Sequence, residues 1–470
     1  MRTFEAKFNL TSPDMEKMFT KLSGSILLLA LLLVGFNSKA QTTTTAAATT
    51  SASTDVKSDK KSDQTTTETK AAPKPAEDTT WKPQRRVWGY AFGDFYYDAH
   101  ADATNRGPEQ NYAGVPKYRN AFQFRRIYLG YDYEITKKFK AELLLASEPS
   151  ANTGVNGTTA IQNGDNLVDS KMAFYIKNIN LRYRDLWNGT DLVVGEMATP
   201  GFAVNEGGTN GPTSLSETTW GYRFIEKTVA DVHKTNSYDV GAALQGTFDP
   251  KTKNFGYVLM VGNNSTANLL SAASANTGFY KIFYGDIWGK FLDKHLLVDI
   301  YADYVRTGGA TTTIGGQSHN MLKGFVAYTS SKLSVGVEAY TQKLTNGVGN
   351  TTTAAPENAT AQALSLWVKG PIVKDKLGFF ARYDGYNPDT DYKTGDAYTA
   401  TPGIFSNYTP VYKESFYTAG LDITPTKNVH FSPNVWYVNY KDQRDAAVTG
   451  RVADDHTLVY RLTFYFVFGK

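Results

Sequence analysis

Most of this chain alternates between apolar and polar side chains in steps of two. Between residues 333 and 342, Leu333, Val335 and Val337 alternate with small or polar residues such as Ser334 and Glu338, and residues 120–135 and 237–248 repeat the pattern. A period of two predicts a β-strand with one apolar face. The polar faces carry charge and glycine, and the apolar faces end in aromatic residues. This combination is typical of strands that face lipid on one side and water on the other.

The alternation predicts sixteen strands. They span residues 87–98, 120–135, 138–148, 173–186, 190–198, 237–248, 254–264, 279–292, 294–307, 320–331, 333–345, 361–372, 375–388, 412–424, 428–440 and 456–468. Tight turns follow the even-numbered strands, and connections of roughly a dozen to nearly forty residues follow the odd-numbered ones. Outer-membrane barrels have short turns on one rim and long loops on the other. The predicted fold class is therefore all-β, a transmembrane antiparallel up-and-down β-barrel of sixteen strands over residues 81–470. A soluble propeller or β-helix is the alternative, but the chain shows no blade or coil repeat.

The first 80 residues have a different character. An apolar run at residues 26–36 follows Lys17 and Lys21 and precedes Ser38-Lys39-Ala40. This run is too short to cross about 30 Å of hydrocarbon as a helix, and its flanks are those of a secretory signal peptide. We therefore expect residues 1–40 to be a signal peptide, with the true start methionine left open. Residues 41–80 are rich in Thr, Ala, Ser and Lys and lack aromatic residues, so we expect a disordered periplasmic spacer whose role stays open.

Composition excludes several other functions. The chain has no cysteine, which removes disulfides and thiolate metal sites, and its formal net charge of +4 is too small for a nucleic-acid-binding face. The six histidines are isolated in the sequence, without metal-ligand spacing, and no nucleophile-elbow or phosphate-loop motif is present. We expect no cofactor, no metal and no enzymatic activity. A Ser/His pair that meets only in space is the alternative that the sequence leaves open.

A barrel of sixteen strands encloses an aqueous channel. Its wall charges can be named from the side-chain alternation along each strand. The candidates are Arg126, Lys140, Glu142, Arg182, Arg184, Asp299, Asp303, Lys369, Arg382 and Asp384, and the longest connection, residues 199–236, adds Glu226 and Lys227. We expect Arg126, Arg182, Arg184 and Lys227 to form an arc that attracts anions. The expected function is passive diffusion of small hydrophilic solutes or ions. A non-conducting adhesin or receptor that binds through its long loops is the alternative.

Three segments resemble the phosphate-selective porin O/P family: Phe124–Tyr133 with its two arginines, Leu192–Phe202 with its Thr-Pro strand end, and Phe224–Thr228. The resemblance covers about residues 86–470. It implies a sixteen-stranded, trimeric outer-membrane porin of a Gram-negative bacterium, with residues 199–236 as the constriction loop. The chain departs from the family pattern at Ala198, Gly201 and Lys227. Lysine is a point charge where arginine is a fork-shaped donor, so oxyanion selectivity stays open.

The last predicted strand carries aromatic or aliphatic residues at every second position, ending at Phe468. It resembles the closing strand that the barrel-assembly machinery recognises in outer-membrane proteins. Here Gly469 and Lys470 follow the final aromatic residue. The resemblance implies that this machinery and the lipid of the outer membrane are partners of the chain.

Overall fold

The structure is a computed structural model. It describes residues 81–107, 112–148, 174–201, 215–233, 237–264, 280–307, 316–350, 356–398, 411–445 and 450–469. One compact unit spans Pro83–Lys470. The predicted signal peptide and spacer, residues 1–80, lie outside the described residues. Within the described ranges, no helix is both long and apolar enough to span a membrane.

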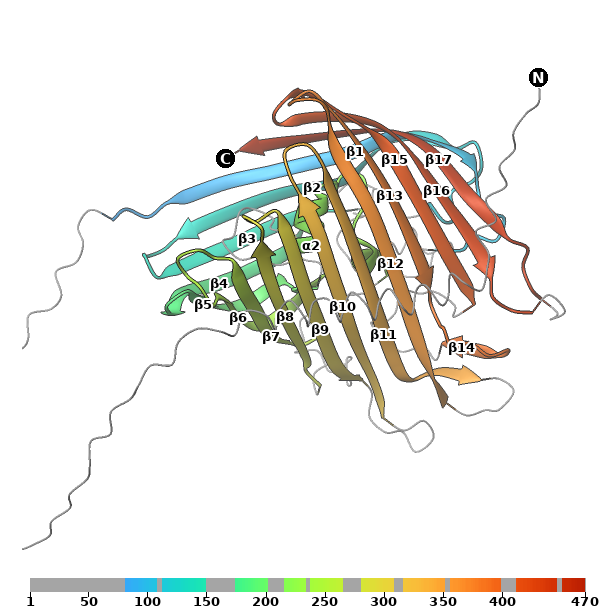
Figure 1. The fold of residues 1–470 in the computed structure, drawn as a ribbon, viewed down its shortest axis with the longest axis horizontal. Coiled ribbons are helices and arrows are strands. Elements are labelled where there is room, and N and C mark those ends of the chain that lie inside the picture. Colours follow the sequence, from blue (N-terminus) through green and yellow to red (C-terminus); the bar gives the residue numbers. More distant parts are fainter. Residues whose placement is uncertain are drawn as a thin grey trace, which may run out of the picture. The chain divides into compact units, whose positions relative to one another are not determined.

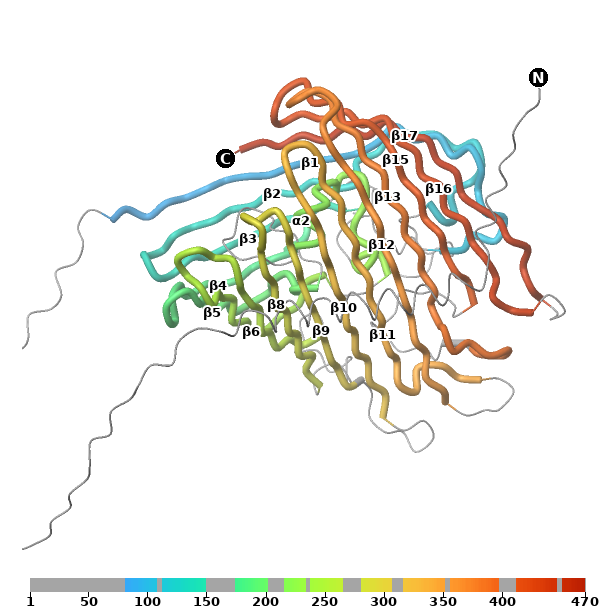
Figure 2. Tube along the Cα trace, viewed as in Figure 1, coloured from blue at the N-terminus to red at the C-terminus, as the bar shows by residue number. Residues whose placement is uncertain are grey.

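The described residues form one closed antiparallel sheet. Its strands are β1 (Arg85–His100), β2 (Asn120–Glu134), β3 (Phe139–Ser147), β4 (Tyr175–Trp187), β5 (Thr190–Ala198), β6 (Tyr238–Thr247), β7 (Phe255–Gly262), β8 (Ile282–Phe291), β9 (Leu296–Thr307), β10 (Gln317–Thr329), β11 (Ser334–Asn350), β12 (Pro356–Val373), β13 (Leu377–Asn387), β14 (Asp396–Tyr398), β15 (Tyr412–Thr426), β16 (Val429–Asp442) and β17 (Asp455–Gly469). Each long strand pairs with its neighbours in sequence, and β1 also pairs with β17. Figures 1 and 2 show the blue β1 beside the red β17, where the barrel closes.

All sixteen predicted strands are confirmed, with small differences at their ends. The largest differences are in β11 and β12, which meet beyond the predicted ends as a polar ribbon, and in the short strand β14, which pairs with β11 and was not predicted. Hydrophobic alternation marks only the part of a strand that contacts lipid. It therefore gives no sign of a strand that continues beyond the lipid.

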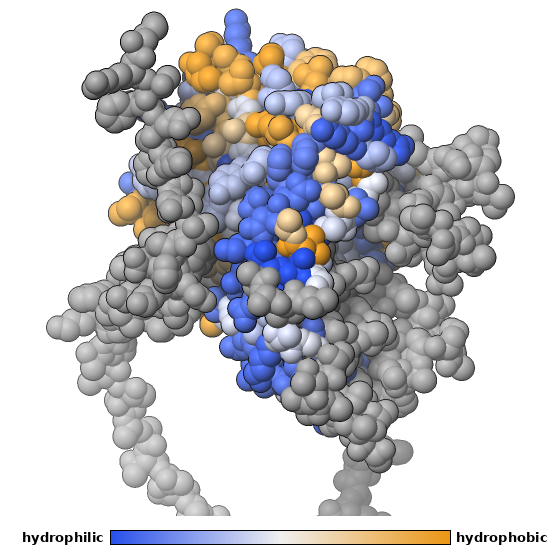
Figure 3. Space-filling model, turned by 90° about the vertical axis from the view of Figure 1, so that its right-hand side faces the viewer, coloured by the Kyte–Doolittle hydropathy of each residue, from blue (hydrophilic) through white to orange (hydrophobic). Residues whose placement is uncertain are grey.

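The two faces of the sheet differ as the alternation predicts. On β11, Val335 is exposed on the outside, whereas Glu338 and Gln342 are buried on the inside. Exposed large apolar side chains on the outer face include Ile179, Leu259, Ile287 and Leu366. Figure 3 shows one face of the molecule, with apolar residues gathered at the top of the view and polar residues below them. An apolar outside and a charged inside are the arrangement of a transmembrane barrel.

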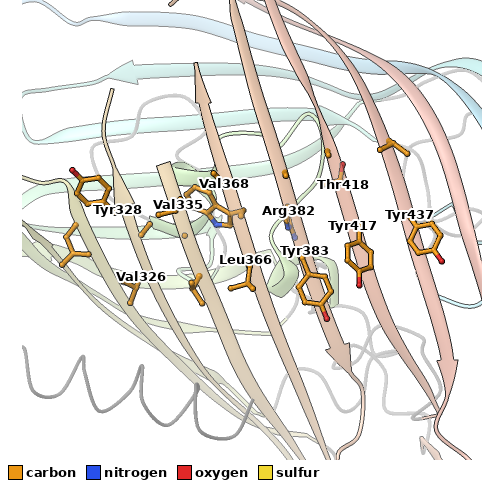
Figure 4. Close-up of a pocket in the computed structure, with 18 residues that line it drawn as sticks. Val326, Tyr328, Val335, Leu366, Val368, Arg382, Tyr383, Tyr417, Thr418 and Tyr437 are labelled. Atoms are coloured by element: carbon orange, nitrogen blue, oxygen red, sulfur yellow. The ribbon is translucent and has the colours of Figure 1, made fainter. Parts of the chain in front are cut away.

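Three tyrosines form a row on the outer face, nearer the rim with the long loops. Tyr383, Tyr417 and Tyr437 stand opposite one another on β13, β15 and β16, with ring centroids 5.0 and 6.0 Å apart. They line one side of a shallow apolar depression of about 760 Å³, shown in Figure 4. Tyrosines at this level are typical of the aromatic girdle at a membrane–water interface.

On the inner side of the sheet, tryptophan rings lie over glycines of the neighbouring strands. Trp88 stands opposite Gly130 and Trp367 opposite Gly336. A Cβ atom added at these glycines would meet the indole ring at 2.0 and 2.2 Å, respectively. The absence of a side chain therefore lets each ring pack flat on the neighbouring backbone, which fixes the register of the two strands.

We expect replacement of Gly336 by leucine to destabilise the folded barrel by about 1–3 kcal/mol or more, because the new side chain would displace the Trp367 ring. The urea concentration at which the protein unfolds in lipid vesicles, followed by its heat-modifiable migration in electrophoresis, measures the effect. Gly285→Leu is the matched control, since nothing lies within 4 Å of a Cβ at that position. Equal midpoints for the two variants would contradict the packing role of Gly336.

Candidate functional site: the lumen and its inner loop

The described part of the longest connection lies inside the barrel. It contains the helices α2 (Leu215–Trp220) and α3 (Val229–His233), which contact β9–β11 and β12, respectively. Trp220, the last residue of α2, packs 5.6 Å from the ring of Trp367, and Phe224, which lies between the helices, stacks on Tyr465 at 4.7 Å. The barrel interior thus presents an apolar patch to these aromatic residues. This contact places the loop across the channel, where a constriction loop would lie.

Arginines of the wall hold the turn between the two helices. Arg461 donates to the carbonyl oxygen of Ile225 at 3.1 Å, and Arg125 donates to the carbonyl oxygens of Ile225 at 3.3 Å and of Phe224. Both guanidinium groups also lie near Asp94, at 2.6 Å for Arg125 and 3.9 Å for Arg461. The buried carboxylate therefore holds the two cations beside the loop, and the cations hold the loop backbone.

Arg382 extends this arrangement on β13. It donates to the backbone carbonyl of Lys227 and, through Nε, to Asp384 at 2.8 Å. Glu226 is buried in the same region and interacts electrostatically with Arg382 and Arg125. Burial raises the pKa of Glu226, and these arginines oppose the shift. Arg382, Asp384 and Glu226, all predicted from the sequence, therefore take part in fixing the loop.

Acidic side chains on the opposite part of the wall bind amide groups of the loop. Asp299 accepts from the backbone N–H of Leu215 at 3.4 Å, and Glu338 accepts from that of Ala230 at 3.4 Å. Lys323, which is fully buried, lies between them, 3.9 Å from Asp299 and 3.5 Å from Glu338. The wall is thus complementary to the loop backbone, with acids facing amides and arginines facing carbonyls.

Two β-bulges aim additional cations inward. On β2, Phe124 pairs with Gly93 and Arg126 with Phe92, so Arg125 is the extra residue. On β4 the register shifts in the same way at Lys177. A bulge adds one residue to one strand and thereby reverses the direction of the side chains beyond it. Strict alternation assigns Arg125 and Lys177 to the lipid face, which is why they were missed. The sequence nevertheless carried a signal, because each of these cations occupies a position that alternation assigns to hydrocarbon, where a charged group is costly.

Four cations, two from the wall and two from the loop itself, gather around two carboxylates. We call Arg126, Lys177, Arg223, Lys227, Glu148 and Asp231 the basic cluster. Glu148 lies 2.7 Å from Lys177 and 3.6 Å from Arg126, and Asp231 lies 3.9 Å from Lys227. Electrostatic interactions of Lys227 with both carboxylates, and with Arg126 and Arg223, join these pairs into one group.

The carboxylates of the basic cluster are ionised at neutral pH. Burial by itself would raise the pKa of Glu148, but Lys177, Arg126 and Lys227 together lower it well below its ordinary value. Burial likewise opposes the lowered pKa of Asp231, where Lys227 and Arg223 prevail. Arg223 also pairs with the buried Glu217 next to the cluster, so four cations face three carboxylates and an excess of positive charge remains.

Nine of the twelve predicted lumen residues are buried inside the barrel, and Arg184, Lys227 and Lys369 are half-buried. The structure separates the four residues of the predicted arc. Arg126 and Lys227 belong to the basic cluster, whereas Arg182 lies 3.1 Å from Asp191 and Arg184 lies 2.6 Å from Glu134, both toward the short-turn rim. The other predicted residues lie beside a partner of opposite charge, a histidine or an aromatic ring: Lys140 with Glu142 at 2.9 Å, Asp303 with His319 at 3.7 Å and Lys369 over Tyr222 at 5.3 Å.

We expect Arg461→Met to loosen the turn of the loop, because it removes a charged hydrogen bond worth about 1.5–3 kcal/mol while Asp94 keeps its contact with Arg125. Single-channel traces in planar bilayers should then fluctuate between several current levels. Arg184→Met is the control, since Arg184 pairs with Glu134, far from the loop carbonyls. Traces from Arg461→Met as steady as those of the control would show that the loop does not depend on this contact.

No family model and no curated protein matches the chain. Solved structures do match it. The anion-selective porin from Comamonas acidovorans is 10% identical, with a TM-score of 0.51, over 82% of this chain and 100% of that chain. The outer membrane channel DcaP of Acinetobacter baumannii is also 10% identical, with a TM-score of 0.50, over 82% of this chain and 97% of that one. At this identity the likeness concerns the fold, and the chain has the fold of these outer-membrane porins and channels.

Proposed function

We propose that this chain is an outer-membrane porin that lets small hydrophilic solutes diffuse passively through its lumen and prefers anions. It acts without catalysis, and small oxyanions are its favoured solutes, in keeping with its resemblance to the phosphate-selective porin O/P family. The same resemblance supports a homotrimer. Recognition of β17 by the barrel-assembly machinery is also proposed, and the outward-facing Leu462, Phe466 and Phe468 of this strand support it.

The observation that carries the proposal is the basic cluster at the constriction loop. Selectivity in a barrel pore depends on the charged side chains at its narrowest part. Many acids elsewhere on the wall are engaged, as Asp299 and Glu338 are with loop amides. The basic cluster therefore dominates the potential that a passing ion meets. The guanidinium group of Arg126 offers a fork-shaped donor of the kind that suits carboxylate and phosphate oxygens, whereas that of Arg223 already donates to Glu217 and to Tyr128.

The rival function is a non-conducting adhesin or receptor. Both functions agree with an apolar outer face and long loops, so conduction must decide between them. The purified, folded protein should give a steady ohmic current in planar bilayers at all moderate voltages. Absence of current from protein that still shows the migration of a folded barrel would support the rival.

We expect the anion preference to follow the charge of the basic cluster. Arg126→Gln combined with Lys177→Gln should lower the anion-to-cation permeability ratio by at least about fivefold, since even one unit charge at 4 Å in water contributes about 1 kcal/mol. Glu148→Gln should raise the ratio, because it removes a carboxylate from the same group. The reversal potential under a tenfold KCl gradient measures both changes.

Arg184→Gln serves as the control for the loss of a cation, because Arg184 pairs with Glu134 outside the basic cluster. Its reversal potential should stay close to that of the wild type. If it shifts as far as that of the double variant, or if Glu148→Gln lowers the ratio, the selectivity does not arise at the basic cluster.

A further inference from the structure

Three metal-ligating side chains that are distant in sequence meet at one rim of the barrel. His100 is the last residue of β1, and Asp455 and His456 are the first two of β17. In the pairing of these strands, His100 stands opposite Leu458, so Asp455 and His456 lie just beyond it. β1 ends and β17 begins at the rim with the long loops, where the first and last strands of the barrel close on each other.

The ligand atoms of this group are close enough for one metal ion. Nε2 of His100 lies 2.8 Å and Nδ1 of His456 lies 3.6 Å from Oδ1 of Asp455, and the ligand atoms all lie within 4.8 Å of one another. Zinc bonds of about 2.0–2.1 Å in a tetrahedron would place neighbouring ligand atoms about 3.4 Å apart. The two stacked rings would have to rotate out of their parallel arrangement to direct both nitrogens at one ion.

The surroundings hold the three side chains in place. The backbone N–H groups of Ala103 and His456 donate to the two carboxylate oxygens of Asp455, at 2.9 and 2.8 Å. The two imidazole rings stack at 4.0 Å, and the ring of His456 lies 5.1 Å from Tyr437 at the end of the tyrosine row. Asp98, which is fully buried, interacts electrostatically with His100 and adds negative charge behind the group.

The group is also accessible. The side chains of His100 and His456 are each 33% exposed and that of Asp455 is 23% exposed, so an ion from the medium can reach them and keep a water ligand. Within the described residues, which include all six histidines, this is the one group of at least three histidine, aspartate or glutamate side chains with this proximity.

We propose that His100, Asp455 and His456 bind a divalent transition metal of the Zn²⁺ class and so join the first and last strands of the barrel at the long-loop rim. Two imidazole nitrogens and one carboxylate oxygen suit Zn²⁺, whereas Ca²⁺ and Mg²⁺ require oxygen ligands. Because the metal would bind the closed barrel and not the open chain, it stabilises the closure. This site is separate from the lumen and does not depend on conduction.

The test is a calorimetric titration of the full-length, untagged protein, folded in detergent and stripped with a chelator, with ZnCl₂ near pH 7.5. We expect one Zn²⁺ per chain, and about tenfold or greater loss of affinity in His100→Gln and in His456→Gln, since even residues that only orient a ligand cost 10–100-fold. His295→Gln is the matched control, because His295 is exposed and bonds the carbonyl of Thr329 at 2.6 Å, away from this group. It should bind Zn²⁺ as the wild type does.

A second measurement covers the case in which a variant folds poorly. The temperature at which the folded band disappears in electrophoresis should rise with Zn²⁺ for the wild type and His295→Gln, and not for folded His100→Gln or Asp455→Asn. Three results would overturn the proposal: no saturable Zn²⁺ binding by the wild type, unchanged affinity in both histidine variants, or an equal thermal shift in Asp455→Asn.

Discussion

Lipid provides no hydrogen-bond partners, so a sheet within it must leave no edge. Each unsatisfied backbone group in hydrocarbon would cost several kcal/mol, which makes a closed barrel one of the few structures that can cross a bilayer. In this chain the pairing of β1 with β17, from Trp88 opposite Gly469 to His100 opposite Leu458, removes the last edge. The separation of apolar outside from charged inside, and the space for an inner loop, depend on that closure.

Once the barrel is closed, its interior must accommodate many charges and a long loop. The charges and the loop stabilise each other, because the charged side chains of the wall serve as hydrogen-bond partners for the loop backbone. Asp299 and Glu338 accept from its amides, while Arg125, Arg382 and Arg461 donate to its carbonyls. Many of the wall charges therefore hold the loop in place. The cations that exceed their partners gather at the loop, and the proposed anion preference rests on them.

Much of the barrel could be predicted from the sequence because lipid imposes a period of two on every strand that it contacts. The inward orientation of Arg126, Glu142 and Asp384 follows from this period alone. Arg125 and Lys177 could not be assigned by a strict period of two, because at each bulge the apolar phase shifts, from Phe124 to Leu129 on β2 and from Ile176 to Ile179 on β4. The extension of β11 beyond residue 345 was missed because it lacks the alternation of a lipid-facing strand, although its Val348 is buried.

Side-chain contacts between residues far apart in the chain could not be predicted from the sequence either. Nothing in the spacing of His100 and Asp455, which are 355 positions apart, indicates that they meet. Their proximity results from the closure of the barrel and the register of β1 on β17. In the same way, the donation of Arg461 to Ile225 joins residues 236 positions apart. Such pairs can be derived only when the order and register of all strands are known.

The most direct test of this account places single cysteines on adjacent residues of β12, which the cysteine-free chain permits. Leu366 is exposed on the outer face and Ser365 is buried on the inner face. A fluorophore at position 366 should be quenched by brominated acyl chains of the surrounding lipid, and one at position 365 only by a water-soluble quencher. Quenching by lipid at position 365, or by neither agent at 366, would contradict a barrel that faces lipid outside and water inside.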